Sequence, residues 1–321
     1  MGLAHWDDVE PYRRAKGEMD ALWQRLGDAA GTKGVGVNRV RVAPGKLSTP
    51  PHAHGASEEV FYVLEGSGLA WQDGQVHDVR PRDCVIHRAA ELAHTFVAGP
   101  DGLDYLVFGT RHATDAAWLP RSGAMRLGRQ WTEGRSDDPW DSEAEVEPLS
   151  YGEPAERPPN ILNVDEVELE HYLAATSAPL ATRELSDQAG FGWERLAPGG
   201  RGSVPHCHSE EEEVFVIIEG EGTLHLWPSP SFAAGTGAEK EEFPLRPGHV
   251  VARPPGTRVS HWFRAGPSGL TMLVYGTRKP NDMCFYPLSS KIAWRGLGVI
   301  GRVEALEYYD GEPDDDFESE D

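Results

Sequence analysis

The sequence contains few cysteines, few basic residues and no long apolar run, and each shortage excludes a class of protein. The cysteines, Cys84, Cys207 and Cys284, are too few and too scattered for the disulfide framework of a small secreted domain. The 30 Lys and Arg are outnumbered by 52 Asp and Glu, which argues against nucleic acid as a partner. No apolar segment opens the chain and no run of 18 apolar residues occurs, so we expect neither a signal peptide nor membrane association, and the cytoplasm by default.

The residues that are abundant favour a turn-rich fold. The 321 residues suggest about two domains, and 36 Gly with 25 Pro are typical of an all-β protein. The last twelve residues, "DGEPDDDFESED" at 310–321, hold eight acids and no base. We expect this tail to be disordered and solubilising.

One segment occurs twice with the same spacing. It reads "PPHAHGASEEVFYVLEG" at 50–66 and "VPHCHSEEEEVFVIIEG" at 204–220. Alternate side chains of a strand share a face, so the two histidines of each copy point the same way. In the first copy a bend at 55–57 must re-aim Glu59 toward them. A surface strand with scattered histidines is the alternative, but the exact repeat favours a metal that takes N and O ligands. The candidate ligands are His52, His54 and Glu59, then His206, His208 and Glu213.

The remaining segments of the first half are assigned by their periodicity. Residues 10–28 have apolar residues at helical spacing and predict an amphipathic helix. Residues 37–45 alternate and predict a strand, and residues 68–83 predict a hairpin that turns at Asp73-Gly74. The apolar positions of the predicted helix are Met19, Leu22, Trp23 and Leu26.

The second half repeats the order of the first, which indicates a duplicated domain. "FVAGPDGLDYLVFGTR" at 96–111 matches "FRAGPSGLTMLVYGTR" at 263–278. The interval between matching residues of the two copies is larger after the second copy's residues 227–240 than before them, so an insertion lies near 227–240. Its Pro and Gly residues predict a loop outside the second barrel, either a lid or a tolerated surface insertion. We predict an N-terminal domain at 1–150 and a C-terminal domain at 151–309.

Each half supplies a third imidazole from a more distant strand, His94 and then His261, after a Pro-led turn. With these residues the chain resembles the cupin superfamily, whose first motif is G-x5-H-x-H-x3,4-E-x6-G. The resemblance implies an all-β fold of two tandem double-stranded β-helix (jelly-roll) barrels with a few short helices. It also implies one metal site in each barrel, formed by His52, His54, Glu59 and His94 and by His206, His208, Glu213 and His261.

The ligand types leave the reaction open. Fe or Mn is favoured, with Ni, Co, Cu and Zn also compatible, and no thiolate is expected to ligate because strand alternation turns Cys207 away. The first hypothesis is a metal-dependent oxygenase of the dioxygenase kind, acting on a small, partly apolar or aromatic molecule. The second is a redox-neutral cupin enzyme (a decarboxylase, isomerase or hydrolase), and the third is a non-catalytic protein that binds or senses a small molecule. Assembly into a homo-oligomer is also left open.

The walls of the predicted pocket are apolar. Strand alternation places Phe61, Phe96, Phe215 and Phe263 on the ligand-bearing face, as substrate contacts or as barrel filling. A charged substrate would require a buried basic residue near the metal. Arg264 falls on the face opposite His261, and Arg258 lies in the preceding turn. On this reasoning the substrate is not a small dicarboxylate.

Overall fold

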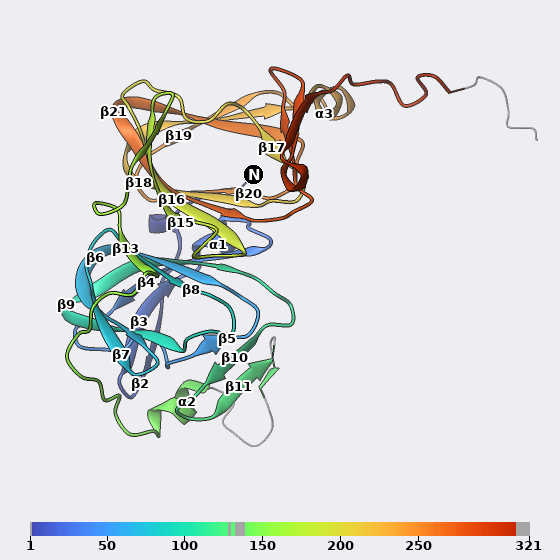
Figure 1. Ribbon diagram of the computed structural model, residues 1–321. Helices are drawn as coiled ribbons and strands as arrows, with labels where there is room; N and C mark the ends of the chain where they lie inside the picture. The colour runs from blue at the N-terminus through green and yellow to red at the C-terminus, as the bar shows by residue number, and fades with distance from the viewer. Residues whose placement is uncertain (1, 128–129, 132–138, 313–321) are drawn as a thin grey trace, which may run out of the picture.

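The structure is a computed structural model that describes residues 2–127, 130–131 and 139–312. The chain forms two β-barrels, stacked one above the other in Figure 1. Each barrel combines an eight-stranded antiparallel sheet with a small four-stranded sheet. The predicted all-β fold of two tandem jelly-roll barrels with a few short helices is confirmed. Residues 313–321 of the acidic tail lie outside the described residues. No helix in the described part of the chain is long and apolar enough to cross a membrane.

The first barrel is built mainly from residues 12–131. Its large sheet has the order β13-β8-β6-β9-β4-β3-β2, with β7 paired to β6. The strands of this sheet are β2 Tyr12–Lys16, β3 Met19–Gln24, β4 Val35–Val42, β6 Glu59–Gln72, β7 Gln75–Val79, β8 Asp83–His87, β9 His94–Thr110 and β13 Ile161–Asn163. The small sheet contains β5 Ala53–His54, β10 Ala116–Leu119, β11 Ala124–Leu127 and β12 Gln130–Trp131.

The second barrel repeats this plan. Its large sheet has the order β1-β20-β18-β21-β16-β15-β14, with β19 paired to β18. Its strands are β1 Leu3–His5, β14 Glu170–Tyr172, β15 Ala175–Ala181, β16 Ala189–Leu196, β18 Glu213–Pro228, β19 Glu241–Leu245, β20 His249–Arg253 and β21 Val259–Thr277. The small sheet contains β17 Cys207–His208, β22 Met283–Tyr286, β23 Lys291–Trp294 and β24 Val299–Arg302. The helical segments of the chain are η1 Trp6–Asp8, α1 Leu26–Ala30, α2 Pro139–Ala144, α3 Pro230–Thr236 and η2 Arg295–Leu297.

The glycine that ends each repeated motif has a steric role. Gly66 and Gly220 have φ of 79° and 75°, in the left-handed region. A Cβ at Gly66 would lie 2.2 Å from the carbonyl oxygen of Gly102, and one at Gly220 would lie 2.2 Å from that of Gly269. The strand registers β6·β9 and β18·β21 shift beside these glycines. The long strands can therefore bend there and close the barrels.

The helix predicted for residues 10–28 is wrong. Residues 12–16 and 19–24 are the strands β2 and β3, which pair as a hairpin through Gly17, whose φ is 54°. Met19 and Ala21 are buried, whereas Leu22 is 36% exposed, which is the period of a strand. The apolar spacing fitted both the helix period and the strand period. The segment is a strand because β3 pairs with β4. The predicted hairpin at Asp73-Gly74 is present, since both residues have positive φ between β6 and β7.

The inserted segment 227–240 is more ordered than the loop that was predicted. Strand β18 continues through Trp227 and Pro228, which pair with Ser260 and Val259 of β21. Helix α3 follows, and Ser229 caps it by accepting a hydrogen bond from the Phe232 amide at 3.4 Å. The prolines were compatible with a strand end and a helix start, which the sequence argument did not consider.

The two barrels exchange strands. β1 belongs to the second barrel, where Leu3 lies opposite Val251, and β13 belongs to the first, where Ile161 lies opposite Val85. In Figure 1 the start of the chain accordingly lies beside β20. The domain limits of 1–150 and 151–309 remain a prediction, because the first strand of each predicted domain contributes to the sheet of the other.

Two buried glutamates fasten the barrels together. Glu212 is 2% exposed and accepts hydrogen bonds from the backbone amides of Lys33 and Gly34 at 2.8 and 2.6 Å. Glu58, also 2% exposed, accepts from the Ser186 hydroxyl and from the amide of Gln188. Each glutamate stands immediately before the glutamate of a predicted metal site, so the barrel contact and the two sites share the same backbone.

Candidate metal centres

Backbone pairing brings the outermost candidate ligands together. The amide and carbonyl of His52 exchange hydrogen bonds with those of His94, at 3.1 and 2.9 Å. His206 and His261 pair in the same way, at 3.3 and 2.9 Å. The chain bends after His54, as predicted from the spacing, and Glu59 then starts β6. All candidate ligands of each half thus converge at one end of their barrel.

The first set of four side chains surrounds one point. The Oε2 atom of Glu59 lies 3.7 Å from His52 Nε2, 3.5 Å from His54 Nε2 and 3.0 Å from His94 Nε2. In an octahedral or tetrahedral site with bonds near 2.1 Å, neighbouring ligand atoms are roughly 3–3.5 Å apart. The spacing therefore suits one divalent ion.

The second set has nearly the same geometry. Glu213 Oε2 lies 3.6 Å from His206 Nε2, 3.5 Å from His208 Nε2 and 3.2 Å from His261 Nε2. Glu213 Oε2, His208 Nε2 and His261 Nε2 are buried without a hydrogen-bond partner. A void of about 10 Å³ lies among His208, Glu213, His261 and Arg253. This is room for a single small ion.

The tautomers of the three histidines around Glu59 indicate that a cation lies between their ring nitrogens and the carboxylate. The Nδ1–H groups of His52 and His94 donate to the carbonyl oxygens of Pro50 and Leu92, and that of His54 donates to Asp115. Each Nε2 then presents a lone pair. Several acceptors facing a carboxylate within 4 Å repel one another unless a shared cation lies between them.

The charges agree with this arrangement. Burial alone would raise the pKa of Glu59, but the neighbouring histidines, His54 foremost, hold it well below its usual value. The corresponding histidines hold the pKa of Glu213 well below its usual value against the same effect of burial. Burial lowers the pKa of His261 to about 4. Ionised carboxylates bind a metal, and so does a neutral imidazole such as that of His261, whereas the raised pKa values of His54 and His208 mean that a metal must displace a proton there.

Two aspartates, which the sequence argument missed, orient the central histidine of each set. Asp115 Oδ2 accepts from His54 Nδ1 at 2.6 Å, and its Oδ1 accepts from the amides of Ala56 and Ser57. Burial would raise the pKa of Asp115, but these hydrogen bonds lower it to about 2. The same carboxylate therefore shapes the bend that re-aims Glu59.

The second aspartate repeats this arrangement. Asp282 accepts from His208 Nδ1 at 2.7 Å and from the amides of Glu210 and Glu211. Burial would lower the pKa of His208, but the hydrogen bond to Asp282, the neighbouring Cys284 and the charge of Glu213 together raise it to about 11. A signal was present in the sequence: Asp282 follows Asp115 by 167 positions, the same interval that separates His261 from His94.

The two centres differ in the residue opposite the ligand glutamate. His87 lies opposite Glu59 in the first barrel, and Arg253 lies opposite Glu213 in the second. His87 is stacked on His94 with ring centroids 3.8 Å apart, and burial lowers its pKa well below the usual value, so it is neutral. Arg253 is 8% exposed and its Nε has no hydrogen-bond partner. The sequence argument considered only Arg264 and Arg258 and missed Arg253, so its inference that no buried arginine accompanies the ligands is wrong.

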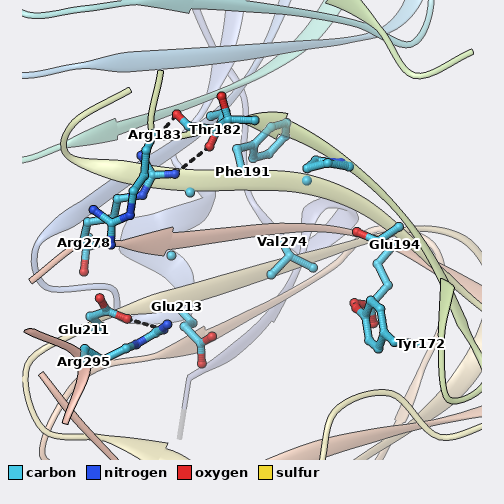
Figure 2. A pocket seen from close by; sticks show the side chains of 17 residues that line it. Tyr172, Thr182, Arg183, Phe191, Glu194, Glu211, Glu213, Val274, Arg278 and Arg295 are labelled. Atoms are coloured by element: carbon cyan, nitrogen blue, oxygen red, sulfur yellow. Dashed lines mark hydrogen bonds and ion pairs between the residues drawn. The ribbon is translucent and has the colours of Figure 1, made fainter. Parts of the chain in front are cut away.

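A cavity of about 440 Å³ lies in the second barrel and reaches Glu213. Figure 2 shows Arg278 and Arg295 at one end of it and Glu194 with Tyr172 at the other. The Tyr172 hydroxyl donates to Glu194, and burial raises the pKa of that carboxyl group.

The 440 Å³ cavity exists because two residues on the inner face of β16 have no side chain. Gly190 and Gly192 line the cavity from β16, next to Glu194. At the registers of Gly190, Gly192 and Glu194, the first barrel has Gly36, Asn38 and Val40, and Val40 is fully buried. Tyr105 opposes Val40, whereas the smaller Met272 opposes Glu194. Asn38 and Tyr105 of the first barrel are thus larger than Gly192 and Met272 at the corresponding registers of the second.

The four predicted pocket phenylalanines lie directly beneath the ligands. Phe61 contacts His94 with ring centroids 5.7 Å apart, and Phe215 contacts His261 at 5.3 Å. Phe61 packs on Phe96 and Phe215 packs on Phe263. All four are at most 6% exposed, and none lines the 440 Å³ cavity. Their role as substrate contacts remains a prediction.

Comparison with known proteins agrees with the two-barrel architecture. The family model "Cupin domain" matches residues 38–106, which contain the ligand set of the first barrel. The family match shows a cupin domain in the first barrel, and the second barrel repeats its sheet order. No curated protein matches the chain by sequence.

The similar solved structures include oxalate decarboxylases. The Lactobacillus farciminis enzyme in complex with formate is 12% identical, with a TM-score of 0.59 and coverage of 88% of both chains. The Bacillus subtilis enzyme at pH 4.6 is 15% identical, with a TM-score of 0.57 and coverage of 86% of this chain and 75% of that one. A further structure of the B. subtilis enzyme concerns its Mn(II) centres, with a TM-score of 0.57, 15% identity and coverage of 86% and 76%. At this identity the likeness establishes the fold.

Proposed function

We propose that the protein is a bicupin metal enzyme whose second barrel carries out a redox-neutral decarboxylation of a small carboxylate. The observation that carries the proposal is Arg253, a buried cation beside His208 and Glu213. Each barrel would hold one divalent metal on its three histidines and one glutamate, with Mn or Fe preferred. A metal bound there would leave open positions that polarise a substrate carboxylate.

Charge favours an anionic substrate in the second barrel. Glu213 neutralises one of the two positive charges of a divalent ion, and Arg253 adds another. Because an unpaired buried charge is costly, this site gains free energy when an anion enters. In the first barrel His87 is neutral, so that site lacks the additional charge.

The cavity offers groups for the other steps. Arg278 and Arg295 lie at one end, where their charge would attract an anion from solution. Arg278 donates to the carbonyl oxygens of Ala181 and Thr182, and Arg295 pairs with Glu211 at 2.6 Å, so both are held in place. Loss of carbon dioxide leaves a carbanion that must take up a proton. Glu194, whose pKa is raised by burial, is the carboxyl group of the cavity that can supply it.

The structural neighbours support decarboxylation more than the oxygenase predicted from the sequence. Those neighbours are oxalate decarboxylases, and one concerns Mn(II) centres. The oxygenase hypothesis required an apolar pocket, whereas the walls of the cavity beside Glu213 carry three arginines and two other acids.

The test is an assay in aerated buffer with the manganese-loaded full chain. A panel of small mono- and dicarboxylates, oxalate included, is incubated with the protein while carbon dioxide release and dioxygen consumption are followed. We expect carbon dioxide release without stoichiometric dioxygen uptake for at least one carboxylate. Turnover of an apolar aromatic compound with one dioxygen consumed per product, and none of any carboxylate, would instead support the oxygenase.

A further inference from the structure

The second centre has a thiol that the first centre lacks. Cys284 of β22 lies directly opposite His208 of β17, and in the first barrel Ala117 of β10 lies directly opposite His54 of β5. Directly opposed residues of an antiparallel pair share a face, so the Cys284 side chain projects from the same face as His208. Cys284 is 2% exposed.

The thiol lies within reach of the ligand atoms. One ligand atom from each of His206, His208 and Cys284 lies within 4.8 Å of the other two. Two ligands on opposite sides of an ion with bonds of about 2.1 and 2.3 Å would be roughly 4.4 Å apart. His208 Nε2 is buried without a hydrogen-bond partner. The sulfur of Cys284 and a ring nitrogen of each histidine are thus spaced as ligands of one ion can be.

The surroundings of Cys284 are also specific to the second barrel. Tyr286, two residues along the same strand face, contacts His206 with ring centroids 6.0 Å apart. The corresponding first-barrel residue, two positions after Ala117, is Leu119. Small apolar residues therefore border the first centre where Cys284 and Tyr286 border the second.

We infer that the Cys284 thiolate is a fifth protein ligand of the second metal centre, so the two centres of this chain differ in metal preference. Binding breaks the S–H bond, releases the proton to solvent and forms a metal–sulfur bond, with no change in oxidation state. A thiol that coordinates an ion is deprotonated. Thiolate is a softer ligand than imidazole or carboxylate, so the second centre favours Zn or Co over Mn relative to the first. The inference rests on the proposed metal occupancy of the second centre.

The test uses Co(II) bound to the full chain. Thiolate ligation gives a near-ultraviolet charge-transfer absorption that nitrogen and oxygen ligands do not give. We expect two Co(II) per chain, with this absorption at the intensity of one Co–S bond. Cys284→Ser should abolish it, while Cys207→Ser and Cys84→Ser should retain it. Ala117→Cys should double it by giving the first centre the same thiol.

A second measurement does not depend on variants. X-ray absorption of the zinc-loaded wild-type chain should show one sulfur neighbour for every two zinc ions. Two bound metals without the charge-transfer band or the sulfur neighbour would overturn the thiolate inference alone. Loss of the band in Cys207→Ser rather than Cys284→Ser would also overturn it. Failure of the second centre to bind any metal would instead overturn the proposed function.

Discussion

The two candidate metal centres share three histidines and one glutamate and differ in the residues around them. Three histidines, one glutamate and an orienting aspartate recur in both barrels with nearly the same distances. Around them, His87 corresponds to Arg253, Ala117 to Cys284 and Val40 to Glu194. The repeated motif therefore accounts for the proposed metal binding, and the residues outside it account for the charged cavity of the second barrel.

The largest expected effect distinguishes the two centres by ligand removal. His206→Ala and His52→Ala should each lower the metal content from two to one per chain, because each removes one of four ligands. Turnover should disappear in His206→Ala and persist in His52→Ala, which elemental analysis and the carboxylate assay can measure together. Persistent turnover in His206→Ala would move the reaction to the first barrel. Circular dichroism provides the control, since both variants should retain the fold.

The next effect concerns the arginine. Arg253→Met should raise KM for the carboxylate by roughly 10–150-fold, because a hydrogen bond to a charged group contributes about 1.5–3 kcal/mol. His87→Gln is the matched control at the same register of the first barrel, and it should leave KM unchanged. Metal content should stay at two in both variants. Equal effects of the two changes on KM would show that the charge of Arg253 does not explain binding of the carboxylate.

The orienting aspartates should have equal effects on their own centres. Asp282→Asn and Asp115→Asn each weaken the hydrogen bond that fixes a ligand histidine. Loss of such a bond costs about 10–100-fold in metal affinity. Competition with a chelator measures the metal affinity of each centre. The Asp115 change is made in the His206→Ala background and the Asp282 change in the His52→Ala background, so that only one centre binds metal. A change below twofold at either centre would show that the aspartate only shapes the loop.

The smallest difference is expected at the contact between the barrels. Glu212→Ala leaves the amides of Lys33 and Gly34 without their acceptor, and Glu58→Ala does the same to Gln188 and its neighbours. Each should lower the free energy of unfolding by about 1–3 kcal/mol. Chemical denaturation of both variants checks this. A strongly unequal cost would show that the two halves are not fastened symmetrically.

The ligands could be predicted from sequence because the motif places them on short strands of fixed spacing. Arg253 could not be predicted, because the turn before His261 is one residue longer than the turn before His94. His87 and Arg253 therefore differ by 166 positions rather than 167, and no constant interval aligns them. The structure aligns them through strand pairing.

Other outcomes depended on contacts that no local pattern reveals. Residues 10–28 fitted a helical stripe, but Gly17 and the neighbouring strand β4 made them a hairpin. The cavity arises from Gly192, Glu194 and Met272 meeting across two strands of the second barrel. Asp115 and Asp282, by contrast, were visible in the sequence as a repeat beyond the segment that ends at Arg111 and Arg278.

The most direct test is a crystal structure of the manganese-loaded protein soaked with a small dicarboxylate such as oxalate. The account predicts electron density for the dicarboxylate on the second metal, within hydrogen-bonding distance of Arg253, and none on the first. A dicarboxylate bound to the first metal beside His87, with the second left free, would contradict it.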